Sequence, residues 1–181
     1  MKVSGISQDI LHVKANALAG KIVLNSSAMV EAIIKHGPLT KFHLADHLDR
    51  IYLECLGLNL EIASRVAFGI LKPQEREIFC DGLNQSVFQL YFMDTNLSDG
   101  SEQQTLVSHL NEAQNMFEVA KKLFSAPGEP PRGTLLWQFA KYLGLEVLKL
   151  PEGGTIHLYE AICIRFGTDS ANMNIPGLLK I

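Results

Sequence analysis

Two histidines four residues apart make FHLADHLDRIYLECLGL, residues 42–58, the first place to look for a metal site. His43 and His47 have the spacing that brings two imidazole rings to one side of a helix, with Asp46 between them. At 3.6 residues per turn, one line of side chains holds His43, His47, Arg50 and Glu54, and another holds Leu44, Leu48, Ile51 and Cys55. The second line is typical of a core face, so the first is expected to face solvent, where Arg50 repels a cation. The inverted zinc-peptidase motif also has glutamate in place of Asp46. We therefore expect no metal and no cofactor.

A calcium loop is the second candidate, in the stretch DTNLSDG that begins at Asp94. Asp94, Asn96 and Ser98 fall at ligand positions one, three and five of such a loop. Position six is Asp99 in place of glycine, and position twelve is Thr105 in place of the glutamate that anchors the ion. Helix capping explains these residues better than calcium does.

Nucleophilic chemistry has three candidate thiols, Cys55, Cys80 and Cys163, none in a Cys-x-x-Cys pair. Cys80 lies in a helical pattern whose apolar face also holds Phe79, Leu83 and Val87, so a packed thiol is expected. A site made from Cys163 with His157 or His109 stays open, because sequence does not show proximity. No glycine-rich phosphate loop is present. Whether the protein is an enzyme is therefore uncertain, with the balance towards no.

Eleven residues, IFCDGLNQSVF, resemble the signature of apoptosis-regulating helical bundles. The positions that match are Phe79, Asp81, Gly82 and Asn84. Gln85, Ser86 and Val87 differ, and the arginine that binds ligand in that family is missing. No family assignment follows.

Two segments fit a DNA-binding helix-turn-helix in part. In TKFHLADHLDRIY, Ala45 fits but Asp49 stands where the turn has glycine. In QFAKYLGLEVLKLPEGG, Ala140 and Gly144 fit but Pro151 interrupts the second helix. The whole chain has a formal net charge of −3, which disfavours a nucleic-acid partner.

The strongest positive signal is a charge distribution. From Glu77 to Glu118 there are seven acidic residues and no lysine or arginine, so this segment carries −7 and each flank +2. Such a segment is either a solvated helix face or a surface that attracts a basic protein. The residues predicted to bind a partner are Glu102, Asn111, Glu112, Asn115 and Glu118.

The elements that position these residues are mostly helical in pattern. SSAMVEAIIKHG, residues 26–37, has serines at its start and glycine then Pro38 at its end, which predicts a short helix. A second helix is predicted from Thr40 to Leu56, a third over NLEIASRVAFGILKP, and a fourth from Pro73 with Glu75 in its first turn. The end of that fourth run, VFQLYFM, reads as a helix end or a buried strand.

The remaining elements complete the predicted fold. Ser101 and Gln104 form a capping box before an apolar stripe that reaches Phe124. The segment 125–133 is rich in proline and glycine and is the one possible internal boundary of a single domain spanning 1–181. TLLWQFAKYLGL predicts a last helix, and EVLKL-PEGG-TIHLYEAICIRF predicts two strands around a turn. The fold class predicted is α+β, mainly helical, with about six helices and a small C-terminal β-hairpin.

Composition completes the functional prediction. An apolar share of 47% and a charged share of 19% are typical of a soluble globular protein. Scattered thiols and the lack of an unbroken apolar stretch predict a cytoplasmic protein with no membrane span. The function predicted is non-catalytic protein binding or regulation through the acidic, amide-rich surface, with a homo-oligomer also possible. The alternatives are a small enzyme with a cleft between helices and, third, a nucleic-acid-binding regulator.

Overall fold

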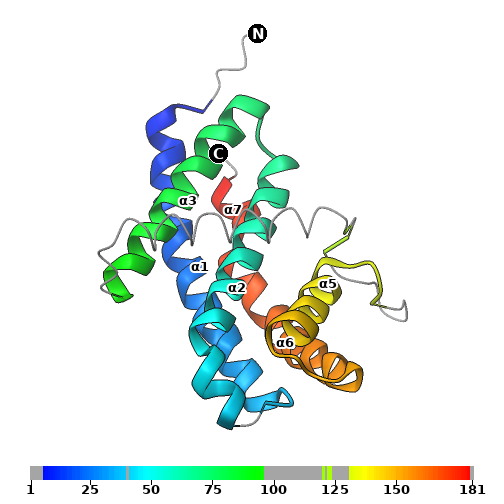
Figure 1. The fold of residues 1–181 in the computed structure, drawn as a ribbon. Coiled ribbons are helices and arrows are strands. Elements are labelled where there is room, and N and C mark those ends of the chain that lie inside the picture. Colours follow the sequence, from blue (N-terminus) through cyan, green and yellow to red (C-terminus); the bar gives the residue numbers. More distant parts are fainter. Residues whose placement is uncertain (1–5, 40, 96–119, 121, 124–130, 180–181) are drawn as a thin grey trace.

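The computed structural model describes residues 6–39, 41–95, 120, 122–123 and 131–179, and of these it describes 41–46, 94–95 and 164–172 by their backbone alone. This part of the chain is mainly helical (Figure 1). The elements are α1 (Gln8–His36), α2 (Lys41–Phe68), α3 (Pro73–Thr95), α5 (Leu135–Tyr142), the π-helix η1 (Leu143–Val147), α6 (Glu152–Met173) and α7 (Ile175–Leu179).

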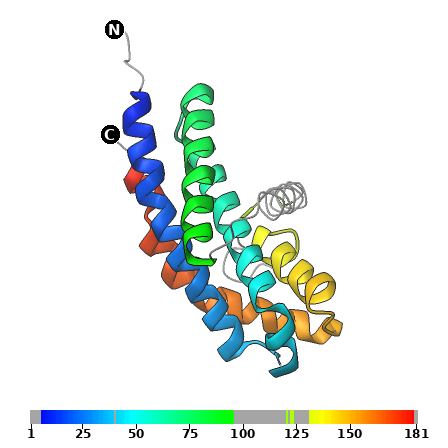
Figure 2. The same ribbon diagram turned by 60° about the vertical axis from the view of Figure 1, so that its left-hand side comes forward.

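Helices α1 and α3 lie side by side and run in the same direction (Figure 2). Their alignment is regular, because the contacts join residues about 70 apart in sequence. The backbone N–H of Ile6 donates to Glu75 Oε1 at 2.9 Å, and Ser86 Oγ donates to Asn16 Oδ1. Between them, a Cβ on Gly82 would lie 2.9 Å from His12 Nδ1, so glycine lets the two helices approach closely.

One hydrophobic core joins the helices of both halves of the described chain. It includes Ile22 of α1, Phe79 of α3 and Phe139 of α5, all with no exposed surface. Helix α6 starts beside α5 and returns along α1 to α7 (Figure 1). The change of direction occurs at Asn174, which has a left-handed backbone with φ of 42°. Because the buried residues form one cluster, these helices make a single domain.

The helix ends use the chemistry that the sequence offers. Ser7 begins α1 by accepting a hydrogen bond from the Ile10 N–H, and Gly37 followed by Pro38 ends it. Pro73 begins α3 as predicted, and Glu75 in the first turn accepts from the Lys72 N–H at 3.0 Å. These backbone hydrogen bonds lower the pKa of the Glu75 carboxyl.

The predicted C-terminal β-hairpin is wrong, and with it the α+β fold class. The segment expected to contain the second strand lies in α6, and the expected turn forms the first turn of that helix. The buried residues of this segment are Gly154, Thr155, Leu158, Ala161 and Ile162, spaced as on one helix face. Ile156 is 50% exposed, so the alternation from Ile156 onwards does not mark a buried strand face.

Several predicted helix boundaries are also wrong, because the structure joins what the sequence divides. Ser26 does not begin a helix but lies within α1, where its Oγ donates to the Ile22 carbonyl at 2.8 Å. Gly57 does not end a helix, since α2 continues through it to Phe68. The ambiguous end of the fourth run belongs to α3. The predicted stripe and capping box from Ser101 lie almost wholly outside the described residues, as does most of the 125–133 loop.

Candidate functional site

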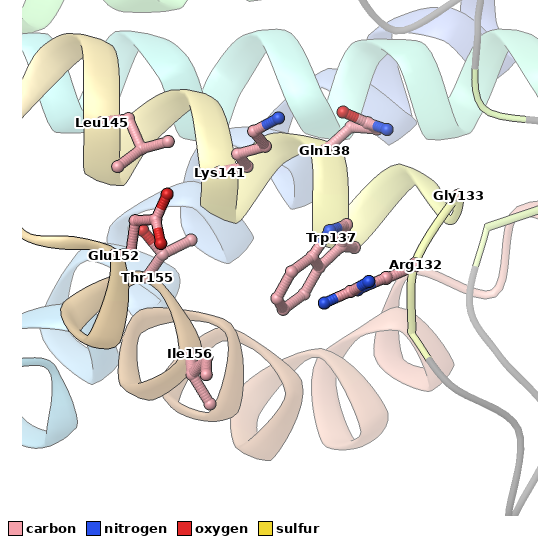
Figure 3. Close-up of a pocket in the computed structure, with 9 residues that line it drawn as sticks. All are labelled: Arg132, Gly133, Trp137, Gln138, Lys141, Leu145, Glu152, Thr155 and Ile156. Atoms are coloured by element: carbon pink, nitrogen blue, oxygen red, sulfur yellow. The ribbon is translucent and has the colours of Figure 1, made fainter.

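A cleft of about 470 Å³ lies between α5 and α6 (Figure 3). Its volume is in the range of small-ligand sites. The lining residues come from the turn before α5, from α5 and η1, and from the first turns of α6: Arg132, Gly133, Trp137, Gln138, Lys141, Leu145, Glu152, Thr155 and Ile156.

The position of Trp137 is set by the start of α5. Thr134 caps this helix, and its Oγ1 accepts a hydrogen bond from the Trp137 N–H at 3.3 Å. The indole ring meets the Tyr159 ring of α6 edge to face, with centroids 5.3 Å apart. Figure 3 shows Arg132 beside Trp137, with Lys141 further along α5 and Glu152 on the opposite wall.

The titratable groups that line the cleft are Arg132, Lys141 and Glu152. They include one carboxylate, Glu152, and neither a histidine nor a cysteine. Thr155 Oγ1 is buried with no hydrogen-bond partner among the described residues. It faces Gly144, where a Cβ would lie 3.0 Å from this oxygen. Gly144 therefore allows α6 to pack against η1, and the hydroxyl belongs to that packing.

A buried carboxylate on α2, Glu54, forms a cluster with Arg50 and Tyr142 and corrects the prediction for the histidine line. Glu54 was expected to face solvent, but its side chain has no exposed surface. Arg50 Nε donates to Glu54 Oε1 at 2.7 Å, and the Tyr142 hydroxyl donates to the same oxygen at 3.1 Å. Leu48, expected in the core, is 43% exposed, whereas Ile51 and Cys55 are buried as expected. The helix is therefore rotated so that Glu54 meets the end of α5.

The surroundings of this cluster explain its protonation behaviour. Burial raises the pKa of the Tyr142 hydroxyl above its usual value. Burial is the largest single influence on the pKa of Arg50 and lowers it, but the hydrogen bonds and charge pairing with Tyr142 and Glu54 together raise this pKa above its usual value. Arg50 Nη2 also donates to the Tyr142 oxygen at 3.2 Å. The cluster ties α2 to α5 just before η1 begins, so it stabilises the junction that shapes the cleft.

The three thiols lie in positions that suppress their reactivity. Cys55 is buried, Cys80 and Cys163 are half-buried, and none forms a disulfide. Burial raises the pKa of each thiol, so the reactive thiolate is disfavoured at neutral pH. The predicted packed environment of Cys80 is confirmed, since Phe79, Leu83 and Val87 are all buried.

The other sequence candidates occupy ordinary positions or lie outside the described residues. His47 is half-buried, and the side chains of His43 and Asp46 are not among those described. Among the described residues, no group of three or more histidine, cysteine or acidic side chains could hold a metal ion. The candidate calcium loop begins at Asp94, in the last turn of α3, and its side chains lie outside those described. Phe79 and Gly82, from the apoptosis-type stretch, are packing residues in the middle of α3.

The predicted partner-binding residues, Glu102, Asn111, Glu112, Asn115 and Glu118, also lie outside the described residues. The described beginning of the same acidic segment is the outer side of α3. There Glu77, Asp81, Gln85 and Gln89 are exposed at intervals of four residues. We call these four residues the acidic row.

Sequence reasoning missed a row of residues on α1 that includes four large exposed apolar side chains, Ile10, Val13, Leu24 and Ile34. Its members recur at alternating intervals of three and four residues: Ile10, Val13, Ala17, Gly20, Leu24, Ser27, Glu31 and Ile34. Val13 is 68% exposed and Leu24 72% exposed. On the neighbouring α3, Leu90 and Met93 are also exposed, Met93 to 77%. We call the eight positions of α1 the outer row.

Helix α1 also meets the length and composition of a membrane span. An 18-residue window within it is sufficiently apolar, and half of that window is buried inside the fold. This qualifies the expectation that no stretch approaches a span. Core helices of soluble proteins can have the same length and composition.

Comparison of the chain with protein-family models, with curated proteins and with solved structures gave no match. Function is therefore argued from the described surfaces and the cleft alone.

Proposed function

We propose that the protein is a non-catalytic protein-binding module, whose contact surface is the outer face of α1 and α3. The observation that carries the proposal is the outer row of α1, where apolar side chains as large as Leu24 and Val13 are more than two-thirds exposed. Large apolar side chains exposed on one helix face are found at interaction sites, where a partner covers them.

The neighbouring acidic row supports the same proposal. Glu77 and Asp81 are exposed beside Gln85 and Gln89, and the chain has no lysine or arginine from Glu77 to Glu118. Protein interfaces commonly combine apolar contacts with charged residues at the rim. The charged border favours a protein with basic residues at its own rim and speeds the encounter with it. The remainder of the acidic segment, with Glu112 and Glu118, extends this proposal by sequence only.

The chemistry of the cleft and thiols supports a non-catalytic role. Catalysis by a nucleophile needs a base within hydrogen-bond reach and a lowered pKa, and burial raises the pKa of all three thiols. A cytoplasmic location is part of the proposal. It is supported by three free cysteines, which stay reduced in that compartment.

The test uses reversal of charge and of polarity on the proposed surface. Candidate binders captured by the immobilised chain are purified, and their association is measured directly with Leu24→Glu and with Glu77→Lys/Asp81→Lys. The first variant should shorten the lifetime of the complex, and the second should mainly slow association and reduce its dependence on salt.

The matched control reverses two exposed acids elsewhere, Asp49 and Glu146, to lysine. This variant changes the net charge equally and should leave binding nearly unchanged. Binding that survives both surface variants, or falls equally with the control, would show that this face is not the contact surface.

A further inference from the structure

The cleft between α5 and α6 has apolar side chains on both of its walls. Figure 3 shows the Trp137 ring extending from α5 towards α6, with Ile156 on the α6 wall. Trp137 is half-buried and Ile156 is exposed over half of its surface. Both therefore keep apolar surface that the fold of the chain does not cover. The surface of an indole ring is matched best by another flat ring, which favours an aromatic occupant.

The aromatic wall of the cleft is fixed by contacts within the chain. Thr134, which begins α5, holds the Trp137 backbone, and the Tyr159 ring meets the indole at 71°. The close packing of Gly144 on Thr155 holds η1 against α6 at the side of the same cleft. A wall that is already ordered loses little conformational entropy when a ligand binds.

Two positive charges in the cleft are available to an anion. Arg132 lies beside Trp137 and Lys141 further along α5 (Figure 3). Both side chains are exposed, and neither forms an ion pair with another residue of the described part of the chain. Capping of a helix end does not account for Lys141, because α5 continues directly into η1.

The one negative charge in the cleft has a separate explanation. Glu152 is the first residue of α6, where the helix dipole stabilises a carboxylate. The three titratable lining groups, Arg132, Lys141 and Glu152, together carry a formal charge of +1 at neutral pH. The charge of the cleft therefore favours an anion, although that of the whole chain is negative.

We propose that the cleft binds a small flat aromatic molecule that carries an anionic group. The ring lies against Trp137 and Ile156, and the anionic group binds Arg132 and Lys141. A guanidinium group donates two parallel hydrogen bonds to a carboxylate or a phosphate, so aromatic carboxylates and aromatic phosphate monoesters share the required chemistry. This site is separate from the outer row of α1, and it does not depend on the proposed protein-binding surface.

The experiment uses the only tryptophan of the chain as its reporter. The indole N–H of Trp137 gives a single signal in a heteronuclear NMR spectrum of the full chain, and this signal lies in the cleft. β-Naphthoate should shift it and reach saturation below about 1 mM. β-Naphthamide lacks the charge and cyclohexanecarboxylate lacks the aromatic ring, so each should bind at least about tenfold more weakly. β-Naphthyl phosphate, titrated in parallel, distinguishes a phosphate site from a carboxylate site.

Charge variants test the role of the two cations. Arg132→Gln/Lys141→Gln should weaken β-naphthoate binding about tenfold or more and leave β-naphthamide binding nearly unchanged. The matched control, Lys35→Gln/Lys149→Gln, removes two exposed positive charges away from the cleft and should bind like the parent. All of these side chains are exposed, so the unfolding midpoints should stay close to that of the parent.

Glu152→Gln gives the opposite sign and separates charge from structure. Removing the opposing carboxylate should tighten β-naphthoate binding severalfold, an effect that loss of a merely structural residue would not produce. An indole signal that neither β-naphthoate nor β-naphthyl phosphate shifts at millimolar concentration would overturn the inference. Equal affinity for β-naphthoate and β-naphthamide, or an equal loss of binding in the control variant, would do so too, because the two cations would then not select the ligand.

Discussion

A buried amide pair between α1 and α2 gives a sharp prediction about how the core is held together. Asn59 has no exposed surface, and its Nδ2 donates to Ser26 Oγ and to the Cys55 carbonyl, both at 2.9 Å. Its Oδ1 accepts from Asn25 Nδ2 at 2.7 Å. Asn25 Oδ1, in contrast, is buried without a hydrogen-bond partner among the described residues. The two asparagines are thus unequal members of one pair.

Because the two asparagines differ in their hydrogen bonds, replacing each one with leucine should lower the free energy of unfolding by a different amount. Asn59→Leu removes the hydrogen bonds that Asn59 makes with Ser26, Cys55 and Asn25, each contributing about 1 kcal/mol. It also leaves the Asn25 amide buried without its partner. We expect it to lower the free energy of unfolding by about 4 kcal/mol. Asn25→Leu removes one such bond and also removes an oxygen that had no partner, so its cost should be smaller, about 1–2 kcal/mol.

The double variant tests the reasoning itself. Asn25→Leu/Asn59→Leu leaves neither member of the pair without its partner, so its cost should fall below the sum of the single costs by about 2 kcal/mol. The measurement is urea unfolding of the four chains, followed by helical signal, with unchanged slopes as the check for two-state behaviour. If the two single variants lose equal free energy of unfolding and the double variant loses their sum, the hydrogen-bond argument is refuted. Side-chain volume alone would then determine the loss of stability.

Three further predictions concern protonation, ions and backbone. Burial raises the pKa of the Cys55 thiol, so the unfolded chain loses this proton first as pH rises. The free energy of unfolding should therefore be unaffected by this thiol below about pH 8.5 and should decrease above it. At pH 10 the decrease should be about 2 kcal/mol larger in the parent than in Cys55→Ala. Equal pH slopes in the two chains would contradict this. Glu54→Ala should cost about 2 kcal/mol, because it removes the hydrogen bonds that Glu54 accepts from Arg50 and Tyr142, whereas Tyr142→Phe should cost about 1 kcal/mol; the reverse order in chemical unfolding would show that the carboxylate is not the centre of the cluster. Lys149 has a left-handed backbone with φ of 52°, so Lys149→Gly should stabilise the protein by up to about 1 kcal/mol, and a lower melting temperature would count against strain there.

Sequence reasoning located helix signals well where they depend on a few local residues. Pro73 with Glu75 predicted the start of α3, and Gly37 with Pro38 predicted the end of α1, since proline and capping chemistry act within one turn. It failed where a local signal is overridden by packing. Ser26 is a capping residue by type, but in α1 its hydroxyl bonds to the preceding turn and to Asn59 in the core.

The hairpin error has the same origin. Gly153 and Gly154 after Pro151 are typical of a turn, yet they form the first turn of α6, where Gly154 packs against Leu150 and Pro38. A glycine near a helix start costs less than one in its middle, and the tertiary contact compensates for it. Over such a short segment, a pattern with apolar residues at every second position also fits much of one helix face.

The cleft and the cluster around Glu54 depend on contacts between distant segments. Glu54 and Tyr142 are 88 residues apart, and Trp137 meets Tyr159 across two helices. A single sequence does not show these proximities. A lone tryptophan after a proline-rich loop was the one available signal for the cleft, and it is too common to identify a site.

The outer face of helix α1 was not predicted from the sequence, although the proposed function depends on it. Its apolar residues lie on two opposite faces. The helix therefore has the length and composition of a membrane span, and its sequence shows no single amphipathic stripe. A helix that is apolar on both faces is stable in water when both are covered. The described fold covers the face of Ile22 and Met29 with α3, α6 and α2, and leaves Val13 and Leu24 open. The exposed apolar area is unfavourable in an isolated chain, and covering it with the apolar surface of a partner returns free energy without any change in the fold. The outer row is therefore better explained as half of an interface than as a tolerated defect. Substituting Leu24 by glutamate while the rest of the core is intact separates these two explanations.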